Sequence, residues 1–434
     1  MISSLKLKIV GFLERLTLPE NIYAMAEEVF ELYGRRKPLK DFSYHHKRIL
    51  VIQPDLIGDV VLTSPFLREL RANYPGSWIT LVVEPHTLNL VEHCPYVNEV
   101  LTYDCKKWRL YWRWKFCLSA AWLSLRHLIW RKFDLVIFPH WEIDHFYATM
   151  LAYLSGAIYR ISYSEKVTVD KQNSNRNYNL LLTHALEEGV VRHEVEQKLF
   201  ILKSLGCELS SDHLEIWLTR DDELFAERFL QTHRYRQTSP LIAMCLGGSH
   251  PRKRWSSDRF LEIARWLIDT CNAQILLVGD LSDRQSGRLF KELGNNLIDS
   301  TGKATIRETA ALLKHCQLYI GNDTGPMHLA AAMKVPVVAI SCHPIQAAAS
   351  RAYSPKRFSP WKVHHKILQP ALASDVCASS GQLENGLSFC DYCISDRAHC
   401  ILGVAVDDVK VAVTEVFILS DQSTREKSDF VGVT

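Results

Sequence analysis

The sequence predicts an α/β protein made of two doubly wound, Rossmann-like domains, each with a parallel sheet covered by helices on both faces. Short runs of nearly continuous apolar residues alternate with helix-like segments, a pattern typical of parallel strands buried on both sides. The alternation runs once from residue 48 and starts again at residue 241. A chain of 434 residues is long enough for two or three domains of ordinary size.

The first domain is expected to span residues 45–232. A helix-like segment over residues 59–73 follows its first strand. The strands are expected at Arg48–Gln53, Trp78–Glu84, Val100–Tyr103, Leu135–Phe138 and Tyr159–Tyr163. Ahead of this domain, residues 1–44 have apolar residues at helical spacing, which predicts a helical N-terminal arm packed on the body. A helix lying on a membrane surface is the alternative.

The second domain is expected to span residues 233–434, including the cysteine-rich tail. The polar segment Gln231–Pro240 ends in proline and is the predicted linker. The strands are expected at 241–246, 274–278, 296–298, 318–320 and 336–340. Because such domains bind ligands at the carboxyl ends of their strands, we expect the functional motifs just after strands, in a cleft between the two domains.

Composition excludes several classes of protein. The 51 basic and 48 acidic residues leave a net charge of +3, too small to indicate nucleic acid as a bulk partner. We expect no membrane-spanning helix and no secretory signal, since no apolar run is long enough and charges interrupt the start of the chain. Eight scattered cysteines fit reduced thiols, so we expect a cytoplasmic protein.

The first motif directly follows the first expected strand. Gly58 allows a tight turn or the close approach of a ligand. Asp59 begins the next helix, and its carboxylate either caps that helix or takes a proton from an attacking hydroxyl as a general base. Asp55 lies earlier in the same loop and is the alternative base.

The second motif follows the first expected strand of the second domain. Small residues are succeeded by three consecutive cations, Arg252–Arg254. This arrangement suits a phosphate-bearing ligand, with the Ser249 hydroxyl donating a hydrogen bond and Lys253 supplying charge. A solvated basic loop is the alternative.

The third motif, Gly321–Ala332, begins where another strand is expected to end. Asp323 or Thr324 can cap the following helix, and Gly325 removes side-chain obstruction. The start of this helix, with a proline in its first turn, offers N–H groups and a positive dipole end to an anion. His328 lies one turn into it. A capped core helix is the alternative.

Two common nucleotide-binding signatures are missing from the sequence. There is no G-x-G-x-x-G. Residues 302–305 resemble the end of a P-loop, but that motif requires glycine where Leu297 stands and serine or threonine where Ala304 stands. There is no D-x-D of the kind that binds a nucleotide sugar through a metal ion. A dinucleotide dehydrogenase and a P-loop NTPase are therefore not supported.

A basic, aromatic stretch spans residues 105–133. It has no acidic residue and holds five of the 11 tryptophans. Such stretches favour an anionic membrane surface or an anionic glycolipid, and we predict peripheral contact with the inner face of the cytoplasmic membrane. An ordinary domain face is the alternative. Single-stranded nucleic acid could use the same chemistry, but we expect no nucleic-acid partner.

Four cysteines cluster in the C-terminal tail. Cys377, Cys390, Cys393 and Cys400 are spaced C-x12-C-x2-C-x6-C, with His399 as a spare ligand. One C-x2-C pair with two outlying thiols could close a structural, tetrahedral zinc or iron site. Free thiols or disulfides are the alternatives, and we expect no role in catalysis.

The three loop motifs together resemble those of the lipopolysaccharide heptosyltransferases, glycosyltransferase family 9. The resemblance covers about residues 47–415, and it is carried by Gly58–Val60, Pro65–Arg71, Lys253–Trp255 and Asn322–Ala332. It implies an inverting enzyme of the two-domain GT-B architecture that needs no metal or other cofactor for catalysis. In that architecture the domain of residues 45–232 would bind the acceptor, and the domain of residues 233–434 would bind the donor. The implied reaction moves heptose from ADP-heptose to a lipopolysaccharide-core or other glycan acceptor.

The resemblance also implies roles for individual residues. Asp59 corresponds to the catalytic base of the family, and Lys253 to the cation that binds the donor diphosphate. Lys303 lies where the family contacts the nucleoside. In this mechanism Asp59 activates the acceptor hydroxyl, and Lys253 stabilises the charge that develops as ADP leaves.

The remaining implied roles concern donor binding. Ser249 replaces the threonine usual in its loop, and Asp323 corresponds to the residue that contacts the donor sugar. Thr324 and Gly325 correspond to backbone donors to the phosphates, and His328 to the histidine beside them. Two alternatives stay open at this point: a GT-B sugar-nucleotide epimerase, which needs no acceptor, and a non-catalytic protein that binds sugar nucleotides.

Overall fold

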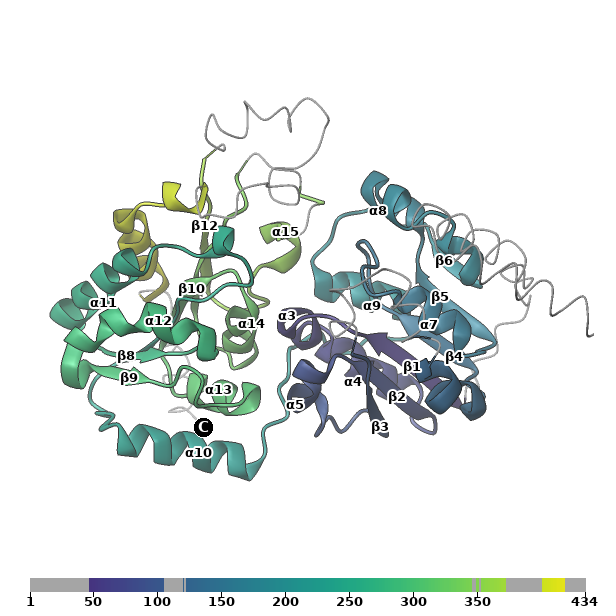
Figure 1. Ribbon diagram of the computed structural model, residues 1–434, viewed down its shortest axis with the longest axis horizontal. Helices are drawn as coiled ribbons and strands as arrows, with labels where there is room; N and C mark the ends of the chain where they lie inside the picture. The colour runs from purple at the N-terminus through teal and green to yellow at the C-terminus, as the bar shows by residue number, and fades with distance from the viewer. Residues whose placement is uncertain are drawn as a thin grey trace, which may run out of the picture. The chain divides into compact units, whose positions relative to one another are not determined.

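The chain folds into two compact units, which Figure 1 shows as a computed structural model. The structure describes residues 47–104, 120, 122–345, 349–350, 353–371 and 400–417. The expected N-terminal arm, residues 1–44, lies outside the described residues. The first unit comprises Met1–Pro54, Arg71–Pro85 and Tyr96–Val190, and the second comprises Asp55–Leu70, His86–Pro95 and Val191–Thr434.

The first unit is built on a six-stranded parallel sheet in the order β3-β2-β1-β4-β5-β6. Its strands are β1 (Arg48–Gln53), β2 (Trp78–Val83), β3 (Glu99–Thr102), β4 (Leu135–Phe138), β5 (Tyr159–Tyr163) and β6 (His184–Leu186). Five of them confirm predicted strands. The sixth, β6, was not predicted, because an edge strand of three half-buried residues leaves no apolar run in the sequence.

Several helical segments complete the first unit. They are α7 (Ala148–Leu154), α8 (Val169–Ser174), a π-helical turn at Ser124–Leu128 and shorter turns such as Ile129–Arg131. Apolar residues of β1, β4 and α7, among them Leu50, Val136 and Leu151, pack into one core. The doubly wound parallel sheet predicted for this part of the chain is therefore confirmed.

The second unit contains a parallel sheet with the same topology, in the order β12-β11-β10-β7-β8-β9. Its strands are β7 (Leu241–Cys245), β8 (Gln274–Leu277), β9 (Leu297–Asp299), β10 (Leu318–Asn322), β11 (Val337–Ile340) and β12 (His365–Leu368). The strand order reverses between β7 and β10, which pair with each other. Loops that follow strands at such a reversal form the usual ligand site of a doubly wound sheet.

The helices of the second unit come from three stretches of the chain. They include α3 (Ile57–Val61), α4 (Ser64–Asn73, whose last residues belong to the first unit), α5 (Leu88–Val91), α9 (Glu194–Ser204), α10 (Arg220–Thr232), α11 (Ser257–Cys271), α12 (Arg284–Gly287), α13 (Ile306–Leu313), α14 (Gly325–Ala332) and α15 (Pro355–Phe358), and residues 406–417 are also helical. Helix α10 includes Gln231 and Thr232, the first residues of the predicted linker, and residues 233–240 lead on into β7.

The single helix expected over residues 59–73 is wrong, because the chain breaks it into α3 and α4. The Thr63 hydroxyl donates to the Asp59 carbonyl at 2.7 Å, and the Ser64 hydroxyl donates to the Val61 carbonyl at 2.8 Å. Hydroxyls that bond to nearby carbonyls compete with the helical pattern. Pro65 supplies no N–H, so it fits the first turn of α4 better than the interior of one long helix.

A buried guanidinium explains why α5 belongs to the second unit. Arg307, in α13, donates to the Asp222 carboxylate of α10 at 2.9 Å. It also donates to the Asn89 carbonyl and to the Glu92 carboxylate beside α5. Burial opposes the charge of Arg307, but its hydrogen bonds to Glu92 and Asp222 raise the pKa of the guanidinium.

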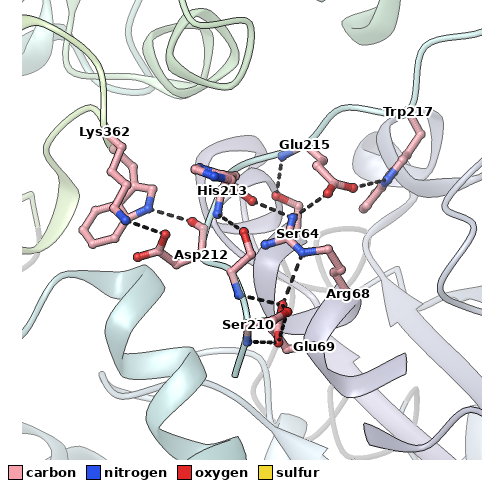
Figure 2. Close-up of polar contacts among 11 residues, drawn as sticks. Ser64, Arg68, Glu69, Ser210, Asp212, His213, Glu215, Trp217 and Lys362 are labelled. Carbon is pink, nitrogen blue, oxygen red and sulfur yellow. Dashed lines mark hydrogen bonds and ion pairs between the residues drawn. The ribbon is translucent and has the colours of Figure 1, made fainter. Parts of the chain in front are cut away.

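A second polar cluster joins α4 to the segment 208–217, as Figure 2 shows. The Glu69 carboxylate is fully buried and accepts hydrogen bonds from the Ser210 N–H at 2.7 Å and the Ser211 N–H at 3.1 Å. Its neighbour Arg68 donates to the Glu215 carboxylate and to the His213 carbonyl. A carboxylate that two backbone donors satisfy in this way fixes the path of the segment.

No helix among the described residues is both long and apolar enough to cross a bilayer.

Replacing Glu69 with alanine should lower the free energy of unfolding by about 1–3 kcal/mol, because the backbone donors of Ser210 and Ser211 would lose hydrogen bonds to a charged acceptor. Urea denaturation measures the change. As a control, Glu262→Ala removes an exposed carboxylate that pairs with Lys410 and should cost at most about 1 kcal/mol. Equal losses for the two variants would contradict the proposed role of the buried carboxylate.

Candidate functional site

The loop after β7 is held at both ends by the side chain of Asn322, the last residue of β10. Its amide nitrogen donates to the carbonyls of Leu246 and Gly247 at 3.0 and 2.9 Å, and its amide oxygen accepts from the Trp255 N–H at 3.0 Å. Asn322 is fully buried, so water does not compete for these bonds. The loop that carries Ser249 and the basic residues is thereby fixed at the reversal of strand order.

Lys253 is the buried cation of this loop. It lies in the turn Pro251–Lys253 with only 6% of its surface exposed, and its ammonium nitrogen is 3.1 Å from the ring centre of Tyr353. Burial lowers the pKa of Lys253, while the nearby charges of Asp323 and Asp59 raise it. The alternative of a merely solvated basic loop is wrong for Lys253, although Ser249 in the same loop is exposed.

Asp323 and Thr324 form the turn between β10 and α14. The Asp323 N–H donates to the Ile340 carbonyl at 3.1 Å. Burial raises the pKa of the Asp323 carboxyl, and the charge of Lys253 opposes that rise. Thr324 is the N-cap residue of α14, but its hydroxyl donates to the Asn322 carbonyl instead of capping the helix. The start of α14 is therefore not closed by the side chain expected to cap it.

The ends of α3 and α14 approach each other closely through two glycines. A Cβ atom added to Gly325 would lie 2.9 Å from the Cβ of Ile57, and one added to Gly58 would lie 2.6 Å from the Cδ2 of His328. Both distances are shorter than an ordinary van der Waals contact. Only glycine fits at these positions without moving one helix.

This contact decides where Asp59 lies. Asp59 is half-buried in the first turn of α3, whose N-cap residue is Leu56. The N-cap position itself is therefore not occupied by Asp59. Its charge is close enough to raise the pKa of Lys253. The second unit thus brings together the expected base and the expected diphosphate cation. Asp55, the alternative base, is buried ahead of α3.

His328 is a neutral histidine beside these charges. Its side chain is almost fully buried, and burial lowers the pKa to about 3, with the charges of His193 and Lys253 acting in the same direction. Among the described residues, no group bonds to its Nδ1 atom. A neutral imidazole with an unbonded ring nitrogen can accept or donate one hydrogen bond, depending on its tautomer.

Lys303 lies apart from the other predicted residues, in the turn after the edge strand β9. It is exposed, its ammonium donates to the Asp299 carbonyl at 2.6 Å, and it lies 5.9 Å from the ring centre of Phe229. Its nucleoside contact stays a prediction.

The predicted metal site falls mostly outside the described residues, because only Cys400 of its four cysteines is described. Over the described ranges, no group of three or more His, Cys, Asp or Glu side chains could hold a metal ion. The structural zinc or iron is therefore without support from the structure.

A pocket of about 510 Å³ lies elsewhere in the second unit. Its lining comes from α9, from Arg192 just before that helix, from the segment 209–212 and from Lys362. None of the predicted site residues lines it, and its carboxylate Asp212 already pairs with Lys362 at 2.6 Å.

A model of glycosyltransferase family 9 (heptosyltransferase) matches residues 122–379, more than half of the chain. The chain belongs to glycosyltransferase family 9. It is therefore a glycosyltransferase, as its loop motifs predicted. The match includes the Lys253 loop and the α14 turn, whereas Asp59 lies before it.

Curated relatives support the same assignment. The chain is 24% identical over 309 residues to lipopolysaccharide heptosyltransferase 2 of Salmonella typhimurium, covering 68% of this chain and 82% of that protein. The enzyme of the same name from Escherichia coli is also 24% identical, over 312 residues and with the same coverage.

Solved structures confirm the GT-B fold. A family 9 glycosyltransferase from Veillonella parvula superposes with a TM-score of 0.68 and 23% identity, covering 87% of this chain and 98% of that one. The E. coli ADP-heptose lipopolysaccharide heptosyltransferase II gives a TM-score of 0.60 and 18% identity, covering 86% of this chain and 99% of that one.

Two residues of the site had no assigned role in the sequence. Asn322 lies inside the third motif, and its position at the end of a strand could have indicated a side chain that ties neighbouring loops. Tyr353 is 100 positions away from Lys253, and no local pattern connects them. Only the packing of the second unit reveals that pair.

Replacing Gly325 with alanine should lower the free energy of unfolding by about 1–3 kcal/mol, because the added methyl group would overlap Ile57 and push α3 away from α14. Thermal or urea denaturation measures the loss. Gly76→Ala is the matched control, since nothing lies within 4 Å of a Cβ atom at Gly76. The close approach of the two helices would be refuted if both variants were equally stable.

Proposed function

We propose that the protein transfers a heptose from ADP-heptose to a hydroxyl group of a lipopolysaccharide-core acceptor. The observation that carries the proposal is the grouping of Asp59, Lys253 and Asp323 around the open start of α14, in a chain of glycosyltransferase family 9. Both relatives described above are named lipopolysaccharide heptosyltransferase 2.

The donor would be bound through its diphosphate. Lys253 supplies a positive charge in a place with little water, where attraction to an anion is stronger than at the surface. The backbone N–H groups at the start of α14, at Thr324 and Gly325, supply donors and the positive end of the helix dipole. The exposed Ser249 hydroxyl lies in the Lys253 loop and would add a donor at its edge. Asp323 would bind hydroxyl groups of the sugar.

The chemical step would be a displacement with inversion at the anomeric carbon. Asp59 takes the proton of the acceptor hydroxyl as the acceptor oxygen forms its bond to the anomeric carbon. The bond from that carbon to the phosphate oxygen breaks, and its electron pair leaves with ADP. Lys253 and the start of α14 stabilise the negative charge that develops on the diphosphate. This sequence of bond changes needs no metal ion.

The reaction itself can be tested with ADP-heptose and a truncated lipopolysaccharide core. Release of ADP should depend on the acceptor, and the heptosylated product should be visible by mass spectrometry. Release of heptose or an epimer without acceptor would favour the epimerase alternative. Tight ADP-heptose binding without turnover on any acceptor would favour a non-catalytic binding protein.

Replacing Asp59 with asparagine or alanine should lower the turnover rate at least about 100-fold, because the acceptor hydroxyl would lose its general base. The affinity for ADP, measured by calorimetry, should change only a few-fold, since the base does not bind the diphosphate. Asp55→Asn is the matched control and should keep most of the activity. If Asp55→Asn removes activity and Asp59→Asn does not, the assignment of the base is wrong.

We also propose that the described part of the basic, aromatic stretch, residues 122–133, contacts an anionic membrane. Trp122, Leu125 and Trp130 have 58%, 62% and 77% of their surfaces exposed. The guanidinium of Arg126 lies 5.0 Å from the Trp122 ring centre, so charge and apolar surface occur side by side. Residues 105–119 and 121 lie outside the described residues. Exposed tryptophans beside cations suit the interface of an anionic bilayer.

The double variant Trp122→Ser/Trp130→Ser should bind vesicles of anionic phospholipid at least about tenfold more weakly, because two indole rings can no longer enter the interface. Co-sedimentation measures the bound fraction. Trp78→Ser removes another exposed tryptophan of the first unit and should leave binding unchanged. Equal binding of all three proteins would remove the membrane proposal without affecting the transferase proposal.

A further inference from the structure

Tyr353 is the nearest described aromatic partner of the buried Lys253 side chain. The ring centre lies 3.1 Å from the ammonium nitrogen. A cation within about 6 Å of an aromatic face is attracted by it, more strongly where water is excluded. Because only 6% of the Lys253 surface is exposed, the attraction between the ammonium and the ring is stronger than it would be at the protein surface.

The backbone around Tyr353 holds the ring in place. Tyr353 has a φ of 64°, in the left-handed region that a tyrosine rarely occupies. Such a conformation persists only where the surrounding structure determines it. Two residues on, α15 begins, and its fully buried Arg357 donates to the Glu194 carboxylate at 3.0 Å and to the Ser350 carbonyl at 3.3 Å.

A further bond fastens the same segment to the start of α9. The Nε2 atom of His193 lies 2.9 Å from the Ser359 carbonyl, and the His193 ring stacks on Trp361 with ring centres 4.3 Å apart. Together with the Arg357–Glu194 pair, this contact anchors α15 and the residues that follow it to the start of α9. Tyr353 therefore lies two residues before a helix that is fastened to α9.

An aromatic face is better suited than a carboxylate to hold an ammonium group that must also bind phosphate. A carboxylate in direct contact would accept the ammonium hydrogens and compete with an incoming anion for them. A ring attracts the charge but takes no full hydrogen bond, so the ammonium keeps donors for phosphate oxygens. The carboxylates Asp323 and Asp59 act on Lys253 through their charge.

We propose that Tyr353 is a positioning residue of the donor site, whose ring holds the Lys253 ammonium where the diphosphate of the nucleotide sugar binds. The inference rests on the proposed function, because it takes a diphosphate as the ligand of Lys253. Tyr353 does not itself touch the reacting atoms in this account; it acts through Lys253.

The test compares Tyr353→Leu, which removes the ring, with Tyr353→Phe, which keeps it. Tyr353→Leu should bind ADP about tenfold more weakly, whereas Tyr353→Phe should stay within about twofold of the unchanged protein. In Tyr353→Leu the KM for ADP-heptose should rise and kcat should fall as well, because Lys253 both binds the diphosphate and stabilises the charge that develops on it. Tyr178→Leu, a half-buried tyrosine of the first unit, is the matched control and should have no effect on ADP binding.

A pH profile separates positioning from simple structural damage. The groups that face Lys253 are Asp323, Asp59, Cys342, Arg252 and His328, and all of them remain in both variants. Without the ring, the pKa of the Lys253 ammonium should be lower. As the pH rises, Tyr353→Leu should therefore lose ADP binding at a lower pH than the unchanged protein does. Tyr353→Phe should restore the original profile.

Two results would overturn the inference. Unchanged ADP binding in Tyr353→Leu would show that the ring does not position Lys253, and tighter binding would show that the ring blocks the site. Inorganic pyrophosphate serves as a second probe, independent of the nucleotide and sugar. If the unchanged protein binds pyrophosphate but neither binds nor uses ADP-heptose, the proposed function fails while the Tyr353 variants still test the inference.

Discussion

Gly58 and Gly325 let the ends of α3 and α14 meet at a distance that no larger residue would allow. Helix α3 carries Asp59 in its first turn, and α14 begins directly after Asp323 and Thr324. The contact therefore places the Asp59 carboxylate near the turn at Asp323 and Thr324 and near the ammonium of Lys253. The imidazole of His328 fills the space beside Gly58, so the two helices pack without a gap.

Burial governs the electrostatics of the groups collected there. It lowers the pKa of Lys253, raises that of Asp323 and lowers that of His328, so each group is pushed toward its neutral form. Lys253 and Asp323 counteract this push in each other because their charges are opposite. A bound diphosphate would strengthen the charged form of Lys253 further. A site with little water makes each of these interactions larger than it would be at the surface.

Buried polar side chains fix the loops and segments of the site through hydrogen bonds. Asn322 ties the Lys253 loop to the end of β10, and the Arg357–Glu194 pair fastens the segment that carries Tyr353. Glu69 does the same for the segment that follows α9. Each of these groups is satisfied by hydrogen bonds, as a buried polar group must be if it is not to destabilise the fold. Loops placed in this way need little rearrangement before a ligand binds.

The sequence by itself determined the two parallel sheets and the motifs that follow their strands, because apolar runs, glycines and charged loops are local signals. It missed the edge strands β6 and β12, which are short and partly exposed, and it merged α3 with α4, whose separation depends on hydroxyl bonds at Thr63 and Ser64. Only the tertiary structure decided that Gly58 packs on His328 and that Tyr353 covers Lys253. Those contacts join residues that lie 100 or more positions apart, and no local spacing rule reaches that far.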